Sequence, residues 1–342
     1  MKAWRVHQHG RPSEALRLDE IPVPKPGPNQ VRIAVRSTVL NFNDIDGCYG
    51  RYKTVNPPLP YTAGMEVVGT VDAAGDGAEV WLGRRVMATP DGAFGGYAEC
   101  AVAGAEMVFD APESLSDREA AAFYFPFHLA YLALHDRARL QPGETVLIHA
   151  AAGGVSSAAV QLAKAIGARV ITTCGGPEKV AFCEKQGVDL ALDYTKQDFF
   201  EPVLKATGGR GVDVVFDTVG GDVAEKSFRC IARGGRHVMV GFASGIEAED
   251  SGLVPRPLMF GNIALLGVLL AYTPSPIAIK EMTGFNLVPR EVGDEIQDAL
   301  LRLLADGAIH PVIGKTVSFD EIPAALEAFE ERKTIGRTVV EL

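Results

Sequence analysis

The sequence is poor in cysteine, and its cysteines follow no pattern. The 342 residues include five, at positions 48, 100, 174, 183 and 230. A disulfide framework is typical of short secreted chains with an even number of closely spaced cysteines. An odd number spread over a chain of this length predicts free thiols.

A long apolar run and an excess of basic residues are also absent. The most apolar stretch, residues 262–271, has roughly half the length of a membrane helix. The opening MKAWRVHQHG lacks the apolar core of a signal peptide. The formal net charge is −10, and lysine and arginine are not clustered. We therefore expect a soluble, cytoplasmic protein with no nucleic-acid or membrane partner.

Two kinds of pattern divide the chain. The first ~120 residues contain β-rich runs between Gly and Pro clusters, which predict an all-β body. From about Ala120, apolar strand runs alternate with amphipathic helical stretches, a pattern that requires parallel crossovers. The predicted strands are Thr145–His149, Arg169–Thr173, Leu190–Asp193, Val212–Asp217, Arg236–Gly241 and Ile263–Leu270, and the predicted helices include Val155–Ile166, Glu178–Gln186 and Asp222–Ile231.

Six such strands fit an α/β fold with a doubly wound parallel sheet of the Rossmann type, in which a ligand binds where the strand order reverses. After Leu270 the pattern weakens into two helices, near Glu295–Ala305 and Ile322–Glu331, and a last strand, RTVVEL. This tail has no core of its own, so we expect it to pack on the N-terminal domain.

A glycine-rich turn between the first of these strands and the next helix is the most informative segment. The strand ends at His149, AAAGGV follows, and the helix begins near Val155. In this context, backbone amides and a helix N-terminus face the pyrophosphate of a dinucleotide. Ala151 and Ser156 stand where the usual motif has its first and third glycines, and Gly153 is where the backbone approaches the phosphate. The predicted contacts are Ala152, Gly153, Gly154 and Val155.

The end of the second predicted strand lacks the acidic residue that selects NAD by bonding the adenosine ribose. Cys174 stands there, followed by Gly175 and Gly176, whose amides the turn supplies, and by Lys179 on the next helix. Tyr194, after the third strand, could offer its hydroxyl at the same point. A cation without a carboxylate suits a 2′-phosphate, so the sequence predicts NADPH as the cofactor.

Several segments together resemble the zinc-independent quinone oxidoreductase family of the medium-chain dehydrogenase/reductase superfamily. They are VLNFNDIDGCYGRY, PLPYTAGMEVVGTV, GGYAEC, AYLALHDRARLQPGETVLIHAAAGGV and VFDTVGGD, and the resemblance covers essentially the whole chain. It implies a GroES-like, partly open β-barrel catalytic domain, residues 1–122 plus 268–342. A Rossmann NADPH-binding domain, residues 123–267, is then inserted in it.

Zinc-dependent relatives carry a Cys ligand soon after the second strand and a later Gly-His-Glu segment. The corresponding stretches here are NFNDID, with Asn43 and Asp44, and AGMEVV, in which Met65 replaces the His. An amide, a carboxylate and a thioether do not make a catalytic zinc site, which uses Cys or His ligands. We therefore expect no metal. A quinone or an enone needs no Lewis acid, because conjugation spreads the incoming charge onto a carbonyl oxygen.

The resemblance also implies which residues lie near the reacting groups. Asn41, Asp44 and Tyr52 are implied near the nicotinamide and the acceptor, as candidate catalytic residues. The further implied cofactor contacts are Gly241 and Phe242 after the fifth strand, Val268 and Leu270 at the end of the sixth, and Arg337, whose guanidinium fork suits pyrophosphate oxygens. Relatives commonly have Thr, whose hydroxyl can hold the carboxamide of the nicotinamide, where this chain has Leu129.

The sequence therefore predicts a zinc-free, NADPH-dependent oxidoreductase that transfers hydride to a small electrophilic acceptor, either a quinone or an α,β-unsaturated carbonyl. Two alternatives stay open: an enoyl-thioester reductase on the same scaffold, and a non-catalytic NADPH-binding sensor or structural protein. The apolar strand Ile263–Leu270 would form an edge of the sheet, where chains can pair. Relatives often join two subunits at this edge, so we expect a homodimer.

Overall fold

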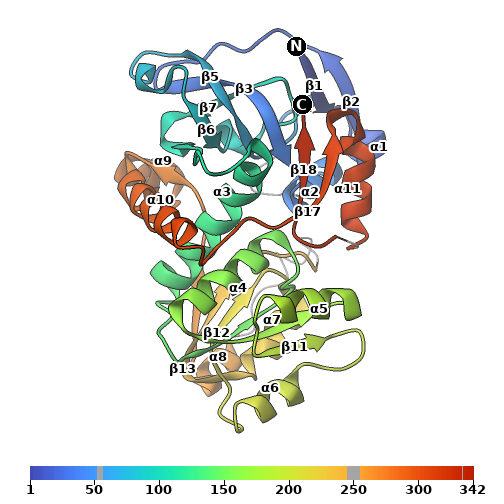
Figure 1. Cartoon of the computed structure of the whole chain (residues 1–342), viewed down its shortest axis with the longest axis vertical. Coiled ribbons are helices and arrows are strands. Elements are labelled where there is room, and N and C mark those ends of the chain that lie inside the picture. Colours follow the sequence, from blue (N-terminus) through green and yellow to red (C-terminus); the bar gives the residue numbers. More distant parts are fainter. Residues whose placement is uncertain (52–56, 245–254, 333) are drawn as a thin grey trace. The chain divides into compact units, whose positions relative to one another are not determined.

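A computed structural model of the chain describes residues 1–51, 57–244, 255–332 and 334–342 (Figure 1). The chain divides into two compact units. The first unit contains Met1–Phe125, Ala271–Gln297 and Pro311–Leu342, and the second contains Pro126–Leu270 and Asp298–His310.

The first unit is built on a seven-stranded sheet. Six strands follow the order β17-β18-β3-β5-β6-β8, and β7 also pairs with β3. These strands are β3 (Gln30–Val39), β5 (Val67–Ala74), β6 (Arg85–Ala88), β7 (Cys100–Gly104), β8 (Val108–Asp110), β17 (Ile313–Ser318) and β18 (Arg337–Glu341). A smaller sheet joins β1 (Lys2–Val6), β2 (Leu16–Glu20) and β4 (Tyr61–Thr62), and β15 (Tyr272–Thr273) pairs with β16 (Val288–Pro289).

The C-terminal tail packs on the N-terminal part of the chain, as predicted. Strand β18 runs antiparallel to β3, with Val339 opposite Val39. Figure 1 draws these two strands from opposite ends of the colour scale. One shared apolar core contains residues from both ends of the chain, among them Val6, Leu40, Ile45, Tyr97, Val317, Ile322, Leu326 and Val340.

The expectation of an all-β N-terminal body is wrong at α2 (Phe42–Tyr49). Asp44 accepts a hydrogen bond from the backbone N–H of Asn41 and so caps this helix. Ile45 and Cys48 are buried on its inner side, and Gly50 ends it in a left-handed conformation. The other helices of this unit are α1 (Pro12–Ala15), α9 (Pro276–Thr283), α11 (Ile322–Glu330), the larger part of α3 (Asp117–Tyr131) and the first half of α10 (Arg290–Ala305).

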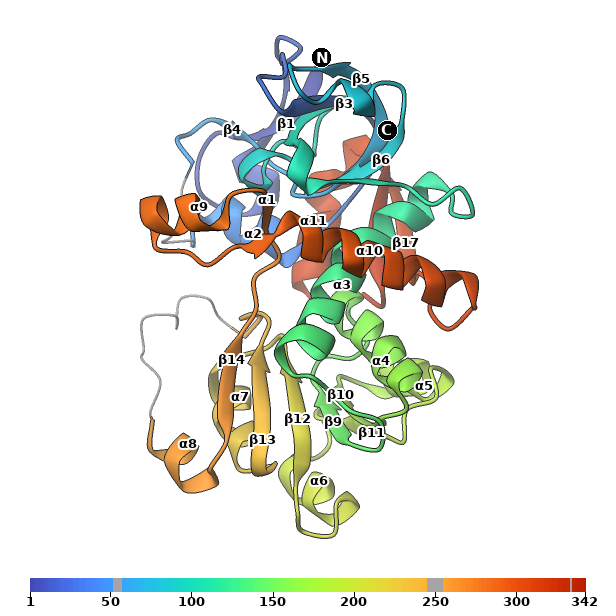
Figure 2. The same cartoon turned by 90° about the vertical axis from the view of Figure 1, so that its left-hand side faces the viewer.

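The second unit is a six-stranded parallel sheet in the order β11-β10-β9-β12-β13-β14, which confirms the doubly wound Rossmann topology. Its strands are β9 (Thr145–Ile148), β10 (Arg169–Cys174), β11 (Leu190–Asp193), β12 (Val212–Asp217), β13 (Ile231–Met239) and β14 (Ala264–Gly267). Its helices include α4 (Gly154–Ile166), α5 (Pro177–Lys185), α6 (Phe200–Ala206), α7 (Gly221–Phe228) and α8 (Arg256–Gly261). Figure 2 shows these helices flanking the sheet.

Some boundaries differ from the predicted ones. Strand β13 begins at Ile231, because Gly235 allows a bulge: a Cβ there would lie 2.9 Å from the carbonyl oxygen of Asp213. Strand β14 ends at Gly267 rather than Leu270. Among the residues that the structure describes, no helix is long and apolar enough to span a membrane.

The tail also contributes to both units, whereas the prediction placed all of residues 268–342 in the first. Residues 298–310 belong to the second unit. The side-chain amide of Gln161, on α4, accepts a bond from the N–H of His310 at 2.8 Å and donates one to its carbonyl at 3.0 Å. These two bonds fix the end of this segment to the second unit.

Candidate active site and cofactor site

The turn from β9 to α4 presents accessible backbone at a helix N-terminus. Gly153 is the N-cap of α4 and is exposed, and Gly154 and Val155 are half-buried, whereas Ala151 and Ala152 are buried. A Cβ on Gly153 would lie 3.2 Å from the carbonyl oxygen of Ala150, so a side chain has little room there. This arrangement is the one that backbone recognition of a phosphate needs.

The turn from β10 to α5 brings together three of the residues predicted to surround the adenosine ribose. Cys174 ends the strand and is buried. The hydroxyl of Tyr194 lies over Gly175, where a Cβ would come within 2.6 Å of it. Lys179, on α5, is close enough to lower the pKa of Cys174, against the larger effects of Cys183 and burial, which raise it. The tyrosine hydroxyl and the lysine therefore flank one turn.

Asp193, the last residue of β11, bonds to this turn and is not among the residues predicted from the sequence. Its Oδ1 accepts hydrogen bonds from the N–H of Gly176 at 2.9 Å and from the hydroxyl of Thr195 at 2.6 Å. These bonds lower its pKa. The amide of Gly176, which we expected to face a ligand, is therefore used within the protein. Asp193 fixes the shape of the turn instead.

The remaining predicted contacts in the second unit lie after strands β13 and β14. The N–H of Gly241 bonds the carbonyl of Asp217 at 3.3 Å, and Phe242 packs beside Gly220 at the start of α7. Val268 is half-buried and Leu270 is buried. All four follow the carboxyl ends of their strands, where Rossmann sheets bind ligands.

The first unit holds a buried polar cluster that contains two of the predicted site residues. Arg337 forms an ion pair with Glu66 and donates a second hydrogen bond to Oδ1 of Asn41 at 2.9 Å. The exposed fractions of Asn41, Glu66 and Arg337 are 6%, 2% and 6%. Burial raises the pKa of Glu66, and the guanidinium of Arg337 and the nearby amide of Asn41 oppose that shift.

The direction of the Asn41 amide follows from its contact with Arg337. A guanidinium can only donate hydrogen bonds, so Asn41 must turn its oxygen toward Arg337. Its Nδ2 is then left as a buried donor, and it has no hydrogen-bond partner in the described part of the chain. The cluster therefore contains an oriented N–H₂ group and, beside it, a carboxylate oxygen, Oε2 of Glu66, which also has no hydrogen-bond partner within the described residues.

Asp44 lies beside this cluster and supports it from α2. Its Oδ2 accepts hydrogen bonds from the hydroxyl of Tyr97 at 2.6 Å and from the N–H of Asn41 at 2.9 Å. Burial raises the pKa of Asp44 to about 7, although both bonds lower it. Asp44 thus holds the backbone of Asn41. Tyr52, the third predicted catalytic residue, lies outside the described residues.

Comparison with known proteins places both halves of the chain in one superfamily. Residues 27–113 match the alcohol dehydrogenase GroES-like domain, and residues 154–282 match the family called zinc-binding dehydrogenase. Quinone oxidoreductase-like protein 2 of Bos taurus is 34% identical over 331 residues, which are 96% of this chain and 89% of that protein. This chain belongs to the quinone oxidoreductase-like family of medium-chain dehydrogenases/reductases.

Two further relatives of this chain are informative. The crystal structure of Escherichia coli quinone oxidoreductase complexed with NADPH has a TM-score of 0.89 and 29% identity, with 100% of each chain covered. A phenolphthiocerol/phthiocerol polyketide synthase of Mycobacterium tuberculosis contains a segment that is 37% identical over 339 residues, which are 99% of this chain but 15% of that protein.

A dinucleotide fits the residues of the second unit. Exposed backbone at the N-terminus of α4 suits a pyrophosphate, and the turn after β10 offers a cation and a hydroxyl with no carboxylate at position 174. The positions that hold zinc in other members of the superfamily carry different residues in this chain. Met65, at the His position, is buried, and no group of three or more His, Cys, Asp or Glu that could hold a metal was found among the described residues.

Three polar residues of these clusters are not among the predicted site residues, although they lie in or beside segments quoted from the sequence. Glu66 lies in AGMEVV and Tyr97 in GGYAEC, and Asp193 directly precedes Tyr194. A glutamate or an aspartate inside an apolar strand run was the available signal, since a buried carboxylate needs partners. The partners themselves, Arg337 for Glu66, Asp44 for Tyr97 and Gly176 for Asp193, are distant in sequence from the residues they bond.

Replacing Asp44 by Asn should remove a pH-dependent part of the stability of the first unit. Folding raises the pKa of Asp44 from 3.8 to about 7. Stability from such a group is fully present below the unfolded pKa and is lost as pH rises through the folded one. We expect unfolding free energy to fall between pH 5 and 8 by roughly 2–3 kcal/mol more in the wild type than in Asp44→Asn.

Urea denaturation followed by tryptophan fluorescence measures this difference, because Trp4 and Trp81 both lie in the first unit. An asparagine oxygen can still accept the bonds from Tyr97 and Asn41, so the variant should fold. The more exposed Asp72→Asn serves as the matched control. Equal losses of stability in the wild type and Asp44→Asn would contradict the prediction.

Proposed function

We propose that this protein reduces a quinone or an α,β-unsaturated carbonyl with NADPH by direct hydride transfer, without a metal. Its family membership supports an oxidoreductase of the quinone oxidoreductase type. The relative from Escherichia coli is complexed with NADPH, which supports the same cofactor here.

The second unit would hold the cofactor with residues that sit at the carboxyl ends of its strands. Gly154 and Val155 at the start of α4 would bind the pyrophosphate through backbone amides, beside Gly153, whose own N–H donates to the carbonyl of Ala150 at 2.8 Å. Lys179 and Tyr194 would bind the 2′-phosphate, which no carboxylate at position 174 repels. Bound there, NADPH supplies the hydride, and the protein orients it.

We base the choice of acceptor on the direction of the Asn41 amide. Its Nδ2 is a buried donor with no partner in the described part of the chain, held by Arg337 on one side and by Asp44 through its backbone. A donor of this kind can bond a carbonyl oxygen, onto which conjugation delivers the incoming charge. Such an acceptor needs orientation and one hydrogen bond rather than a Lewis acid.

Arg337 acts in this scheme by orienting Asn41. Its ion pair with Glu66 already balances its charge. Its implied contact with the pyrophosphate stays a prediction, for which Nε is the available donor, since it has no partner in the residues described.

An enoyl thioester is a second candidate acceptor. It is favoured by the 37% identity to a segment of a polyketide synthase. The double bond of an enoyl thioester is conjugated to a carbonyl, so the same Asn41 donor would serve it. The two candidates differ in the acceptor alone.

NADPH oxidation at 340 nm with a benzoquinone, a naphthoquinone, an enone and an enoyl thioester tests the function. We expect turnover with at least one acceptor, and a loss of ~10²-fold or more in kcat in Asn41→Ala, the usual effect of removing one such donor. Asn43→Ala, an exposed amide two residues away, should keep its activity. NADPH binding with no turnover of any acceptor would favour a sensor instead.

Lys179→Ala should weaken NADPH but not NADH. A hydrogen bond to a charged group contributes about 1.5–3 kcal/mol, which is the expected loss in NADPH binding energy measured by fluorescence titration. Lys185→Ala, exposed at the end of the same helix, is the control. Equal losses for NADPH and NADH in Lys179→Ala would refute the assignment of the 2′-phosphate site.

We also propose a homodimer formed through β14, the edge strand of the second sheet. Leu269, just beyond this strand, is 58% exposed. Light scattering at micromolar concentration should give a dimer for the wild type and a larger monomer fraction for Leu269→Lys. Val80→Lys, at an exposed position in the first unit, should remain a dimer. A monomeric wild type would exclude this interface.

A further inference from the structure

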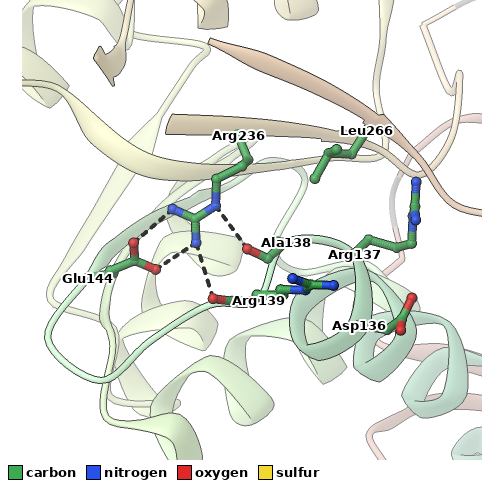
Figure 3. Close-up of a pocket in the computed structure, with 7 residues that line it drawn as sticks. All are labelled: Asp136, Arg137, Ala138, Arg139, Glu144, Arg236 and Leu266. Carbon is green, nitrogen blue, oxygen red and sulfur yellow. Dashed lines mark hydrogen bonds and ion pairs between the residues drawn. The ribbon is translucent and has the colours of Figure 1, made fainter. Parts of the chain in front are cut away.

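A cavity of about 400 Å³ that is widely open to solvent lies in the second unit between the turn after α3 and the strands β13 and β14. Its lining includes Arg137, Arg139, Arg236, Asp136, Glu144 and Leu266 (Figure 3). Five of these six side chains carry charge, although the chain as a whole is acidic. The proposed hydride transfer does not use this cavity, although Leu266 lies on β14, the strand proposed as the dimer edge.

Arg236 is a structural member of the lining. Its guanidinium forms two bonds of 2.7 Å to the carboxylate of Glu144. It also donates to the carbonyls of Ala138 at 2.9 Å and Arg139 at 3.3 Å, as the dashed lines of Figure 3 show. The bidentate pair neutralises both charges, and the carbonyl bonds fix the backbone that carries Arg139.

Arg137 and Arg139 are the other two cations of the lining. Both are exposed. Nε of Arg137 donates to the carbonyl of Gly267 at 3.0 Å, which anchors the side chain and leaves its terminal nitrogens unused. Neither guanidinium has a carboxylate within ion-pair distance among the described residues. Asp136 is the one remaining negative charge of the lining, so two unpaired cations face one carboxylate.

The backbone at Arg139 also points to a functional role. Arg139 has φ +49°, in the left-handed region that favours glycine. It directly follows Ala138, which caps the helical turn Leu132–Arg137, a position where glycine is the usual residue. An arginine there costs stability that a glycine would not, and strain of this kind is found at functional sites.

The cavity is distinct from the proposed cofactor site. Glu144 directly precedes β9, and Arg236 lies level with Val146, the second residue of β9, because both are paired with Val214. The turn at Gly153 follows the opposite, carboxyl end of β9. A ligand in the cavity would therefore not compete with a dinucleotide at that turn.

We propose that this cavity binds a phosphate monoester of about the size of a nucleoside monophosphate. Arg137 and Arg139 would bind the phosphate, since guanidinium forks match phosphate oxygens. Leu266 offers an apolar wall to the rest of the ligand. The open cavity is larger than a bare phosphate requires, which leaves room for the esterified group.

Calorimetric titration of the full chain with uridine 5′-monophosphate, compared with uridine, tests this site. We expect the monophosphate to bind about tenfold or more tightly than uridine, as charge-assisted bonds imply. Arg139→Gly and Arg137→Gln should each weaken the monophosphate about fivefold or more, and Asp136→Asn should strengthen it. Arg17→Gln, which removes an exposed charge from the first unit, should change nothing.

Arg139→Gly also separates binding from folding. Glycine suits the left-handed backbone, so the melting temperature should stay the same or rise while monophosphate binding is weakened. The titration is repeated with saturating NADPH, and binding should persist. Equal affinity for uridine and its monophosphate, unchanged binding in both arginine variants, or displacement by NADPH would each overturn the proposal.

Discussion

In the first unit, one buried guanidinium joins three segments that are far apart in the sequence. Arg337 opens the last strand, Asn41 follows β3, and Glu66 precedes β5. Moving a charge out of water costs several kcal/mol, so neither Arg337 nor Glu66 would be stable in this position alone. The pairing of β18 with β3 brings the two charges together, and their contact then sets the direction of the Asn41 amide. The tail is therefore part of the site as well as part of the core.

In the second unit, carboxylates fix the shape of turns by accepting hydrogen bonds from backbone N–H groups. Asp193 accepts the N–H of Gly176 after β10, and Oδ1 of Asp217 accepts those of Val219 at 2.7 Å and Gly220 at 3.1 Å after β12. Each carboxylate fixes the turn at the carboxyl end of a strand. These turns keep their shape through bonds within the protein. At the start of α4 the N–H of Gly153 is likewise bonded, to the carbonyl of Ala150 at 2.8 Å, so the amides of Gly154 and Val155 are the ones placed to meet a ligand.

The sequence predicted best where one local rule decided the structure. Alternating strands and helices predicted all six parallel strands, since each crossover is local and has one hand. The same approach failed at α2, which is only eight residues long. Its hydrophobic pattern is weak, and it forms because Asp44 caps it and because Ile45 and Cys48 are buried against distant residues. Tertiary burial overrode a short and ambiguous local signal.

The same distinction between local and tertiary determinants applies to the candidate site. The glycine-rich turn and the absence of an acid at Cys174 could be recognised directly, because a phosphate is bound by backbone whose position follows from the strand and helix beside it. The engagement of Arg337 by Glu66 could not, and neither could the capture of the Gly176 amide by Asp193. Both depend on which polar groups are buried together, and a buried charge takes the partner that the fold places within reach. The sequence by itself determined the family, the two folds and the glycine-rich turn that we propose as the cofactor site; the tertiary structure alone decided which side chains are bonded to one another.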